Sequence, residues 1–413
     1  MIDCPDKAGG IDVHSRTLVA TIVNDREEYV TQNFLATSSG HEALLKWFLD
    51  NGCSRVLFEA TGVYWYPLYL AVFQSLKVVV ANPWHVKCHY KVKTDKRDSR
   101  WLARLCLKEA VNPSRVFVGD RHEFRELSRH RETLVKMRTA LKNRVHRQLV
   151  LCNVKLGSVF TDCFGKKGRH ILEALLGGTP LESILEDKKL RLGEDRKRKL
   201  REAVKNELDP LSVEAIRRNL EMIDFLDGQI RIVEARLGEQ GSRWKKQLRL
   251  IASIPGVGVL SAHLVLSEIG DIDDFETGEQ LASYFGIVPF VSESGGKPFT
   301  GHITKHGSPH MRRVLIQIAH VIGRMKCKMG RYYNRLKERK GAGVAAVATA
   351  RKLLCLIHHL LKNDEEYEEE GHKKKPVRKM PMVQTETSLE HAIEIVQKAG
   401  FSLRRDKRRR TTT

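Results

Sequence analysis

Four acidic residues in the first hundred positions have types and a spacing that suit metal-assisted chemistry on phosphodiesters. Asp12 and Glu59 lie in or at the ends of apolar strand-like runs, GIDVHSRTLVATIVN and RVLFEATG, where a carboxylate is costly unless it has a charged partner. Asp95 and Asp98 lie three residues apart at the start of a helical pattern, so they share one helix face. Converging carboxylates can hold two divalent ions that activate an attacking oxygen and stabilise a leaving one. Magnesium is the expected ion, because it binds carboxylates while keeping waters and substrate phosphates as ligands.

An α/β domain in the first part of the chain would position these carboxylates. IDVHSRTLVATIVND and EYVTQNFLAT predict three antiparallel strands, with turns at 14–16 and 25–28. HEALLKWFLDNG predicts a helix that ends at Gly52, and a strand, a helix, a strand and a helix follow in SRVLFEAT, YWYPLYLAVFQSL, KVVVANP and the segment from about residue 95. This is the element order of the ribonuclease H-like fold. It places Asp12 on the first strand, Glu59 at the end of the fourth and the other two carboxylates on the last helix.

The charge balance of the 413 residues favours a polyanionic partner. Lys and Arg number 72 against 50 Asp and Glu, which gives a formal net charge of +22. The positive charge is clustered, as in HYKVKTDKR, DRKRKLREAVK and LRRDKRRR, and this disfavours a merely soluble basic protein. Nucleic-acid contacts are expected from these basic residues: Lys93, Lys96, Arg97, Lys297, Lys305, Arg312 and Arg313. The alternative is that Lys96, Arg97 and Arg100 only pair with Asp95 and Asp98 on a solvated helix.

The cysteine pattern and the hydropathy pattern favour a cytoplasmic protein. The eight cysteines form no CxxC pair, so neither a zinc knuckle nor a disulfide framework is indicated. No apolar run approaches the roughly 20 residues that span a bilayer, and MIDCPDKAGG lacks the basic and apolar regions of a signal peptide. We expect no membrane partner, and an association with the nucleoid when the protein is bound to DNA.

The middle of the chain, 121–247, predicts long charged helices with apolar residues every seven positions. One set comprises Leu127, Leu134 and Leu141 with Met137, Val145 and Leu149; a second comprises Ile216, Ile223, Ile230 and Leu237 with Leu220 and Val233. Such repeats are typical of an antiparallel helical arm or of a coiled-coil dimer contact. Ordinary helix packing within one domain is the alternative, and the heavily charged outward faces favour the arm.

The third region, 248–362, contains two motifs. IPGVGVLSAHLV resembles a helix-hairpin-helix, in which backbone N–H groups hold a phosphate; Gly256 and Gly258 permit the turn, and a simple packing turn is the alternative. Further on, Ser292 and Ser294 precede a Gly-Gly pair and a set of basic residues, Lys297, Lys305, His306, Arg312 and Arg313. Most such serines form turns, and no adjacent base is evident that would make one a nucleophile. A metal site from another domain could provide that activation.

The last region, 363–413, is expected to be mostly disordered. It begins with the acidic run DEEYEEE, continues with basic residues and ends in LRRDKRRRTTT. One short helix is predicted within SLEHAIEIVQKAG. The domain boundaries expected from the sequence are therefore 8–120, 121–247, 248–362 and 363–413.

Five segments, in this order, resemble one known family: GIDVHSRTLVATI, FEATGVYWYPL, NPWHVKCHYKVKTDKRDSRWLARL, IPGVGVLSAHLVLSEIGD and GIVPFVSESGGKPFTGHITKHGSPHMRR. The family is that of the DEDD-type transposases of the insertion sequence 110 family, also called bridge recombinases. The resemblance covers most of residues 8–330. It implies a RuvC-like, ribonuclease H-type N-terminal domain, a coiled-coil insertion and a mainly α C-terminal transposase domain with a catalytic serine.

The resemblance also implies roles for individual residues. Asp12, Glu59, Asp95 and Asp98 would hold magnesium, and Ser294 would attack DNA to form a covalent phosphoserine, with Ser292 as the nearest competitor. Members of the family are thought to act as homo-oligomers in which the metal site of one subunit completes the serine site of another. Some use a non-coding guide RNA to select donor and target DNA.

The expected function is that of a DNA transposase or recombinase that excises and inserts its own element. The expected partner is DNA, both element ends and target; a guide RNA enters by analogy alone. One alternative is a Holliday-junction-type metal-dependent endonuclease, in which the same carboxylates activate water. Another is a non-catalytic nucleic-acid-binding protein, which would leave Asp12 and Glu59 without a purpose.

Overall fold

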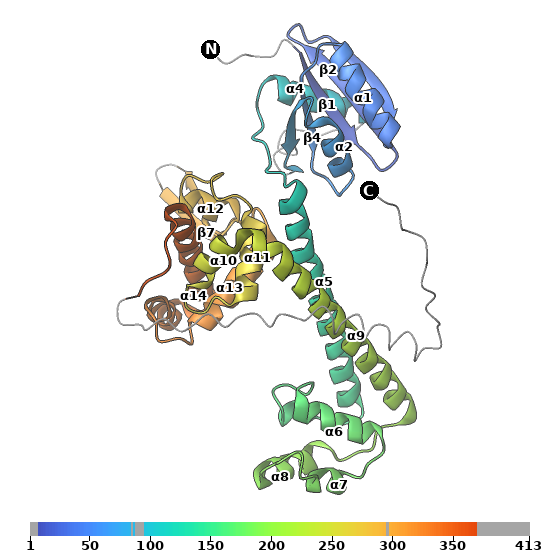
Figure 1. Ribbon diagram of the computed structural model, residues 1–413, viewed down its shortest axis with the longest axis vertical. Coiled ribbons are helices and arrows are strands. Elements are labelled where there is room, and N and C mark those ends of the chain that lie inside the picture. The colour runs from blue at the N-terminus through green and yellow to red at the C-terminus, as the bar shows by residue number, and fades with distance from the viewer. Residues whose placement is uncertain (1–6, 84–85, 87–94, 295–296, 370–413) are drawn as a thin grey trace, which may run out of the picture. The chain divides into compact units, whose positions relative to one another are not determined.

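The computed structural model describes residues 7–83, 86, 95–294 and 297–369, with only the backbone described for 95–96, 291–294 and 297–300. The chain divides into two compact units, Met1–Phe117 and Val118–Thr413. The first is a mixed sheet with helices on it, and the described part of the second is mostly helical (Figure 1). The expected helix within SLEHAIEIVQKAG lies outside the described residues.

The sheet of the first unit has five strands in the order β3-β2-β1-β4-β5. Their bounds are β1 Lys7–Val13, β2 Thr17–Asn24, β3 Tyr29–Leu35, β4 Arg55–Glu59 and β5 Lys77–Ala81. β1, β2 and β3 pair antiparallel through the two predicted turns, whereas β4 and β5 join parallel to β1. The three antiparallel strands and the alternating elements that follow are confirmed.

Helices cover both faces of this sheet, as the alternation of buried side chains requires. Ile11 and Phe58 pack under α1 (Ser38–Asp50) and α2 (Trp65–Val72), in one apolar cluster. Ala8 and Leu57, on the opposite face, pack under α4 (Asp95–Leu107) in another. The two faces of β1 and β4 therefore have different neighbours, and α4 packs on the face to which the carboxylates belong.

In the second unit, α5 (Gly119–Leu151) and α9 (Pro210–Gly241) pack side by side and antiparallel (Figure 1). The direction follows from the paired residues, because Arg131 contacts Glu234 while Gln148, further along α5, contacts Ser212 on the earlier part of α9. All six apolar residues predicted for the α9 seam are buried. The intrachain pairing explains that stripe, and a coiled-coil contact between subunits stays a prediction.

Met137 is a correction to the predicted seam of α5, because half of its surface (50%) is exposed. Leu134, three residues earlier, is buried against Leu226, Ile230 and Val233 of α9. A single partner helix covers only one stripe of α5, and Met137 lies beside that stripe. The distal ends of α5 and α9 carry a separate apolar core formed with small helices: η1 Leu156–Ser158, α6 Lys166–Leu176, α7 Leu181–Glu186 and α8 Glu194–Ala203.

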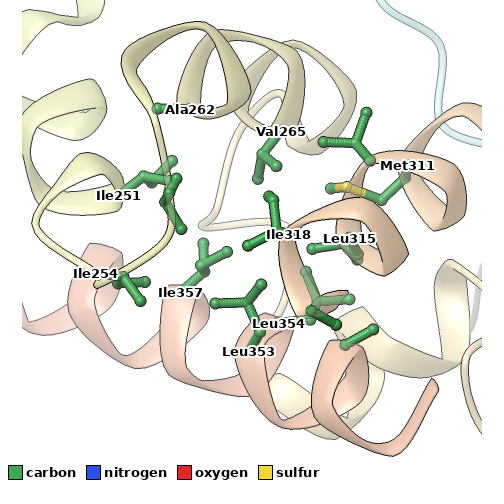
Figure 2. Packing of buried hydrophobic residues seen from close by; sticks show 14 of the residues in the cluster. Ile251, Ile254, Ala262, Val265, Met311, Leu315, Ile318, Leu353, Leu354 and Ile357 are labelled. Atoms are coloured by element: carbon green, nitrogen blue, oxygen red, sulfur yellow. The ribbon is translucent and has the colours of Figure 1, made fainter. Parts of the chain in front are cut away.

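The remaining elements form a helical bundle with one β-hairpin. Their bounds are η2 Ser242–Trp244, α10 Lys245–Ala252, α11 Val259–Ile269, α12 Gly278–Tyr284, β6 Pro289–Ser294, β7 Lys297–Ile303, α13 Pro309–Ile322 and α14 Lys328–Asn363. Figure 2 shows the core, where Ile251 of α10, Val265 of α11, Ile318 of α13 and Leu354 of α14 meet.

Two expectations about the end of the chain need correction. α14 is long and apolar enough, by length and composition, to cross a membrane, although the sequence led us to expect no such run. Half of that window is buried, because Leu353, Leu354 and Ile357 pack into the core of Figure 2 and such a helix needs apolar residues on several faces. Residues 364–369, expected in the disordered tail, make defined contacts with the bundle, for example from Tyr367 N to Ser253 Oγ at 2.8 Å.

Candidate active site

The two strand carboxylates lie next to each other at one edge of the sheet. β1 and β4 are parallel neighbours whose register pairs Ile11 with Phe58, and Asp12 and Glu59 are the next residues on the two strands. Because side chains alternate along a strand, both carboxylates belong to the face of Leu57, which α4 covers. Asp12 therefore lies on the first strand and Glu59 ends the fourth, as the segment order predicts.

α4 brings its N-terminal end to the same edge. Near the middle of the helix, Ser99 Oγ lies 2.8 Å from Thr21 Oγ1 on β2. In the last turn of α4, Arg104 Nη2 donates to Glu27 Oε1 at 2.8 Å. Glu27 belongs to the loop after β2, and because β2 is antiparallel to β1, this loop lies beside the start of β1. α4 thus runs antiparallel to β1, and its first turn approaches the end of β1 where Asp12 lies.

Gly10 permits this close packing of α4 on β1. A Cβ at this position would collide with the backbone of Ser99 and Ala103, so a larger residue would push the helix away. Asp98 precedes Ser99 and is half-buried, whereas the side chain of Asp95 is outside the described part of the chain. Three elements therefore bring predicted carboxylate positions to one edge of the sheet.

Hard carboxylate oxygens from three elements are the donor type that magnesium prefers. Among the described side chains, which exclude that of Asp95, no three His, Cys, Asp or Glu residues are close enough to hold a metal ion. Carboxylates repel one another without a cation between them, so ion binding would draw these side chains together. The residues fit magnesium by donor type and by position at one edge.

The immediate neighbours of the two strand carboxylates are polar. His14 Nε2 lies 3.1 Å from Asp12 Oδ2, and the Thr61 hydroxyl donates to Glu59 Oε1. Both carboxylates are half-buried, with 21% of the Asp12 side chain exposed, although the apolar strand-like runs around them indicate burial. A strand end at the rim of a sheet explains the difference. His14 was not predicted from the sequence, although its spacing of two from Asp12 could have indicated it.

The serine segment forms a two-stranded hairpin in the second unit. β6 and β7 pair antiparallel, Ser292 opposite Phe299 and Ser294 opposite Lys297. Ser294 is the last residue of β6, so it lies at the tip of the hairpin, and the Gly-Gly pair that follows is outside the described residues. The side chains of Ser292, Ser294 and Lys297 are likewise not described, and the choice between the two serines stays a prediction.

Two arginines predicted to bind nucleic acid have protein partners in the structure. Arg312 Nη1 donates to the carbonyl oxygens of Phe285, His306 and Gly307 at 3.0–3.2 Å. These hydrogen bonds hold the loop after the hairpin against the bundle. Arg313 Nη2 lies 2.9 Å from Glu132 Oε2 on α5. Lys305 and Arg97 are exposed, whereas Lys93 and the side chain of Lys96 are outside the described residues.

The glycines of the PGVG turn, between α10 and α11, differ in their surroundings. Gly256 has a positive φ of 87°, and a Cβ there would lie 2.7 Å from Ile322 of α13, so the turn packs against the bundle. Gly258 has open space at its Cβ position and directly precedes α11. The packing alternative therefore accounts for Gly256, while the start of α11 beside Gly258 stays the predicted phosphate-binding position.

Two buried carboxylates that the sequence analysis did not single out join α5 to the bundle. Glu268 on α11 is 2% exposed and accepts hydrogen bonds from Arg125 and from Arg129, whose Nε is 2.9 Å away. Burial alone would raise the pKa of Glu268, but the Arg129 hydrogen bonds and the charges of both arginines lower it on balance.

Glu132 on α5 contacts Lys136, His310 and Arg313 at 2.7–2.9 Å. Burial opposes its ionisation, but hydrogen bonds from these three residues lower the pKa of Glu132 to about 2. These contacts hold the start of α13 against α5. They are structural in character, because the cations around this carboxylate belong to the protein itself.

Comparisons with known proteins agree with the resemblance seen in the sequence. A DEDD-type IS110 family profile described as "Transposase" matches residues 9–154, and the profile "Transposase IS116/IS110/IS902 family" matches residues 248–334. A Coxiella burnetii protein, "Transposase for insertion sequence element IS1111A", is 28% identical over 77% of this chain and 80% of its own length. A "Probable family 20 transposase" of Pseudomonas aeruginosa is 29% identical over 67% and 75%. A "Pilin gene-inverting protein" of Moraxella bovis is 24% identical over 88% and 98%.

Proposed function

The chain belongs to the IS110 family of transposases, enzymes that act on DNA, and from this premise we propose that it excises and inserts an insertion sequence by serine attack on DNA phosphodiesters. The first unit is proposed to be a ribonuclease H-like, RuvC-like domain. The proposed site of action is the cytoplasm, with the nucleoid as the DNA-bound location. The inversion activity named for the Moraxella bovis relative is a rearrangement of the same general kind.

The observation that carries this proposal is the meeting of Asp12, Glu59 and the first turn of α4 at one edge of the sheet. A purely structural use of Asp12 and Glu59 would favour full burial, as at Glu268, which is 2% exposed. Half-buried carboxylates at a strand end are instead accessible to an ion and to a substrate phosphate.

When bound, magnesium would supply Lewis-acid stabilisation of the charge that develops on the attacking and leaving oxygens. Asp12, Glu59, Asp95 and Asp98 would hold it. His14, 3.1 Å from Asp12, would orient that carboxylate, and Thr61 would orient Glu59 through its hydrogen bond. We place the nucleophile at Ser294, where the hairpin tip would present a hydroxyl to the DNA backbone.

A serine needs activation to act as a nucleophile. We propose that the carboxylate edge of one subunit serves Ser294 of another, which makes the active form a homo-oligomer. A guide RNA is a further proposed partner for the choice of donor and target DNA. Its support is the family resemblance and the basic character of the chain.

The test is replacement of Ser294 by Ala, with Ser292→Ala as the matched control. DNA carrying the element ends is incubated with each variant, and denaturing electrophoresis detects protein joined covalently to DNA. We expect the adduct and recombination to be lost in Ser294→Ala and kept in Ser292→Ala. Recombination by Ser294→Ala would exclude this serine as the nucleophile. Metal-dependent cleavage by Ser294→Ala without any adduct in the wild type would favour the junction-endonuclease alternative.

A second experiment separates an enzyme from a binding protein. Asp95→Ala is expected to bind DNA as well as the wild type or better, because it removes a negative charge, while losing magnesium-dependent turnover. Retention of turnover would remove Asp95 from the site. RNA that co-purifies with the protein and is enriched for the flank of its gene would support guiding, and consistent absence of such RNA would contradict it.

A further inference from the structure

The acidic run after α14 lies along the outward face of α10. Asp364 pairs with Lys246, Glu366 Oε1 lies 2.6 Å from Arg249 Nε, and Tyr367 N donates to Ser253 Oγ at 2.8 Å. Residues 364 and 367 are about 10 Å apart if the chain between them is extended, and the seven-residue step from 246 to 253 rises about 10.5 Å along the axis of α10. The match of the two lengths explains why successive partners stay in register. We call residues 364–369 the acidic strap.

The acidic strap is anchored at its far end, whereas its cationic partners on α10 are exposed. Tyr367 packs against the core of the bundle, and Glu369, with a side chain 6% exposed, accepts from the backbone N–H of Lys328 at the start of α14. In contrast, the side chains of Lys246 and Arg249 are 68% and 72% exposed in their ion pairs. Exposed pairs of this kind are weak and screened by salt, so another polyanion can replace the strap at these two cations.

The charge density of the acidic strap is close to that of a nucleic-acid strand. Five of its six residues are acidic, and six residues span at most about 20 Å, which gives roughly one negative charge per 4 Å. Each strand of duplex DNA carries about one phosphate per 3.4 Å of helix axis. The covered helix also leads directly into the PGVG turn, where the start of α11 beside Gly258 is the predicted phosphate-binding position.

We propose that the outward face of α10, with Lys246 and Arg249, is a binding surface for the backbone of duplex DNA, and that the acidic strap occupies it in the free protein. The proposal rests on the proposed function only for the identity of the polyanion. DNA that reaches α10 must displace Asp364 and Glu366 from their partners. The strap therefore weakens binding to DNA that engages α10 alone, and it is released by DNA that also engages other sites.

The experiment measures binding of a fluorescently labelled random-sequence DNA duplex to the full chain, by anisotropy at several salt concentrations. All variants carry Asp12→Asn, so turnover and failure of the proposed catalytic chemistry do not affect the result. Glu366→Gln is compared with Glu365→Gln, which removes the same charge one residue away, where the partner is His359 on α14.

We expect Glu366→Gln to bind the duplex about threefold more tightly near 50 mM salt and to steepen the slope of log K against log salt by about 0.9, the effect of one added phosphate contact. Glu365→Gln should stay within twofold of its parent, and Arg249→Ala should abolish the gain from Glu366→Gln. Equal gains in duplex affinity from Glu365→Gln and Glu366→Gln would show that the strap acts only by general charge repulsion. A gain in affinity that persists in Arg249→Ala would show the same, and either result would overturn the proposal. A gain seen with single-stranded RNA but not with the duplex would assign α10 to RNA and overturn the choice of DNA.

Discussion

Carboxylates occur at two different depths in the two units of this chain. Glu268 of the second unit is 2% exposed and enclosed by Arg125 and Arg129. Asp12 of the first unit keeps 21% of its side chain exposed at a strand end, beside the half-buried Glu59. Glu268 is buried with two guanidinium groups and so stabilises the packing of α5 on α11. A carboxylate at the rim of a sheet is partly exposed, and its oxygens are accessible to an ion. The same chemical group thus supports folding in one unit and is proposed to support chemistry in the other.

The largest expected effect is the loss of activity when a carboxylate of the first unit is replaced. Asp12→Asn should lower the rate of DNA strand transfer by about 10³-fold, equivalent to roughly 4 kcal/mol, because a metal ligand is lost. Its urea midpoint should equal or exceed that of the wild type, since an edge carboxylate contributes little to folding. Strand-transfer assays and urea unfolding of the same preparation measure both quantities. Normal activity in Asp12→Asn would place this residue outside the site.

The opposite pattern is expected for the buried carboxylate of the second unit. Glu268→Gln should destabilise the fold by about 3–5 kcal/mol, because it leaves Arg125 and Arg129 without the charge that compensates their desolvation. Urea unfolding followed by circular dichroism measures the loss. A change below about 1 kcal/mol would show that the pairing is not the reason for the burial of Glu268.

The contribution of Glu132 to the stability of the second unit is expected to depend on pH. Its folded-state pKa of about 2 lies below the ordinary value of 4.5, so its contribution to stability is present above about pH 4.5 and is lost as the pH falls toward 2. We expect Glu132→Gln to be less stable than the wild type at pH 6, and the difference to shrink between pH 4.5 and pH 2.5. Parallel stability curves for the two proteins over that range would contradict the assignment.

The smallest effect is expected at an exposed ion pair of the first unit. Arg104 and Glu27 lie 2.8 Å apart with 38% and 52% of their side chains exposed. Arg104→Ala should cost at most about 1 kcal/mol of stability, because exposed pairs gain little over hydration. Thermal unfolding at two salt concentrations would measure it. A loss comparable to that of Glu268→Gln would mean that exposure does not separate the two kinds of carboxylate.

Local sequence patterns were sufficient for most of the fold of the first unit. Alternating apolar residues, turn residues and one helix stop predicted its strands and the order that brings Asp12 and Glu59 to one edge. The buried stripe of α9 was also predictable, since a seven-residue repeat is a local signal. For each of these elements, the spatial neighbours follow from the order of the elements along the chain.

What the sequence could not predict depends on distant partners. Arg129 and Glu268 are 139 residues apart, and no local pattern distinguishes Glu268 from a solvated acid. The exposure of Met137 depends on which stripe of α5 a helix about 90 residues later covers. The acidic strap was predicted to be disordered because its composition favours solvation, and the cations of α10 that hold residues 364–369 lie more than a hundred residues earlier in the chain.

The carboxylate edge is proposed to bind a divalent ion, and direct metal titration tests this binding best. Manganese, as a spectroscopic substitute for magnesium, is titrated into the full chain, and electron paramagnetic resonance measures the free ion. We predict saturable binding by the wild type, its loss in Asp12→Asn and in Glu59→Gln, and unchanged binding in Glu27→Gln, the surface control. Equal manganese binding by the wild type and by Asp12→Asn and Glu59→Gln would contradict the account.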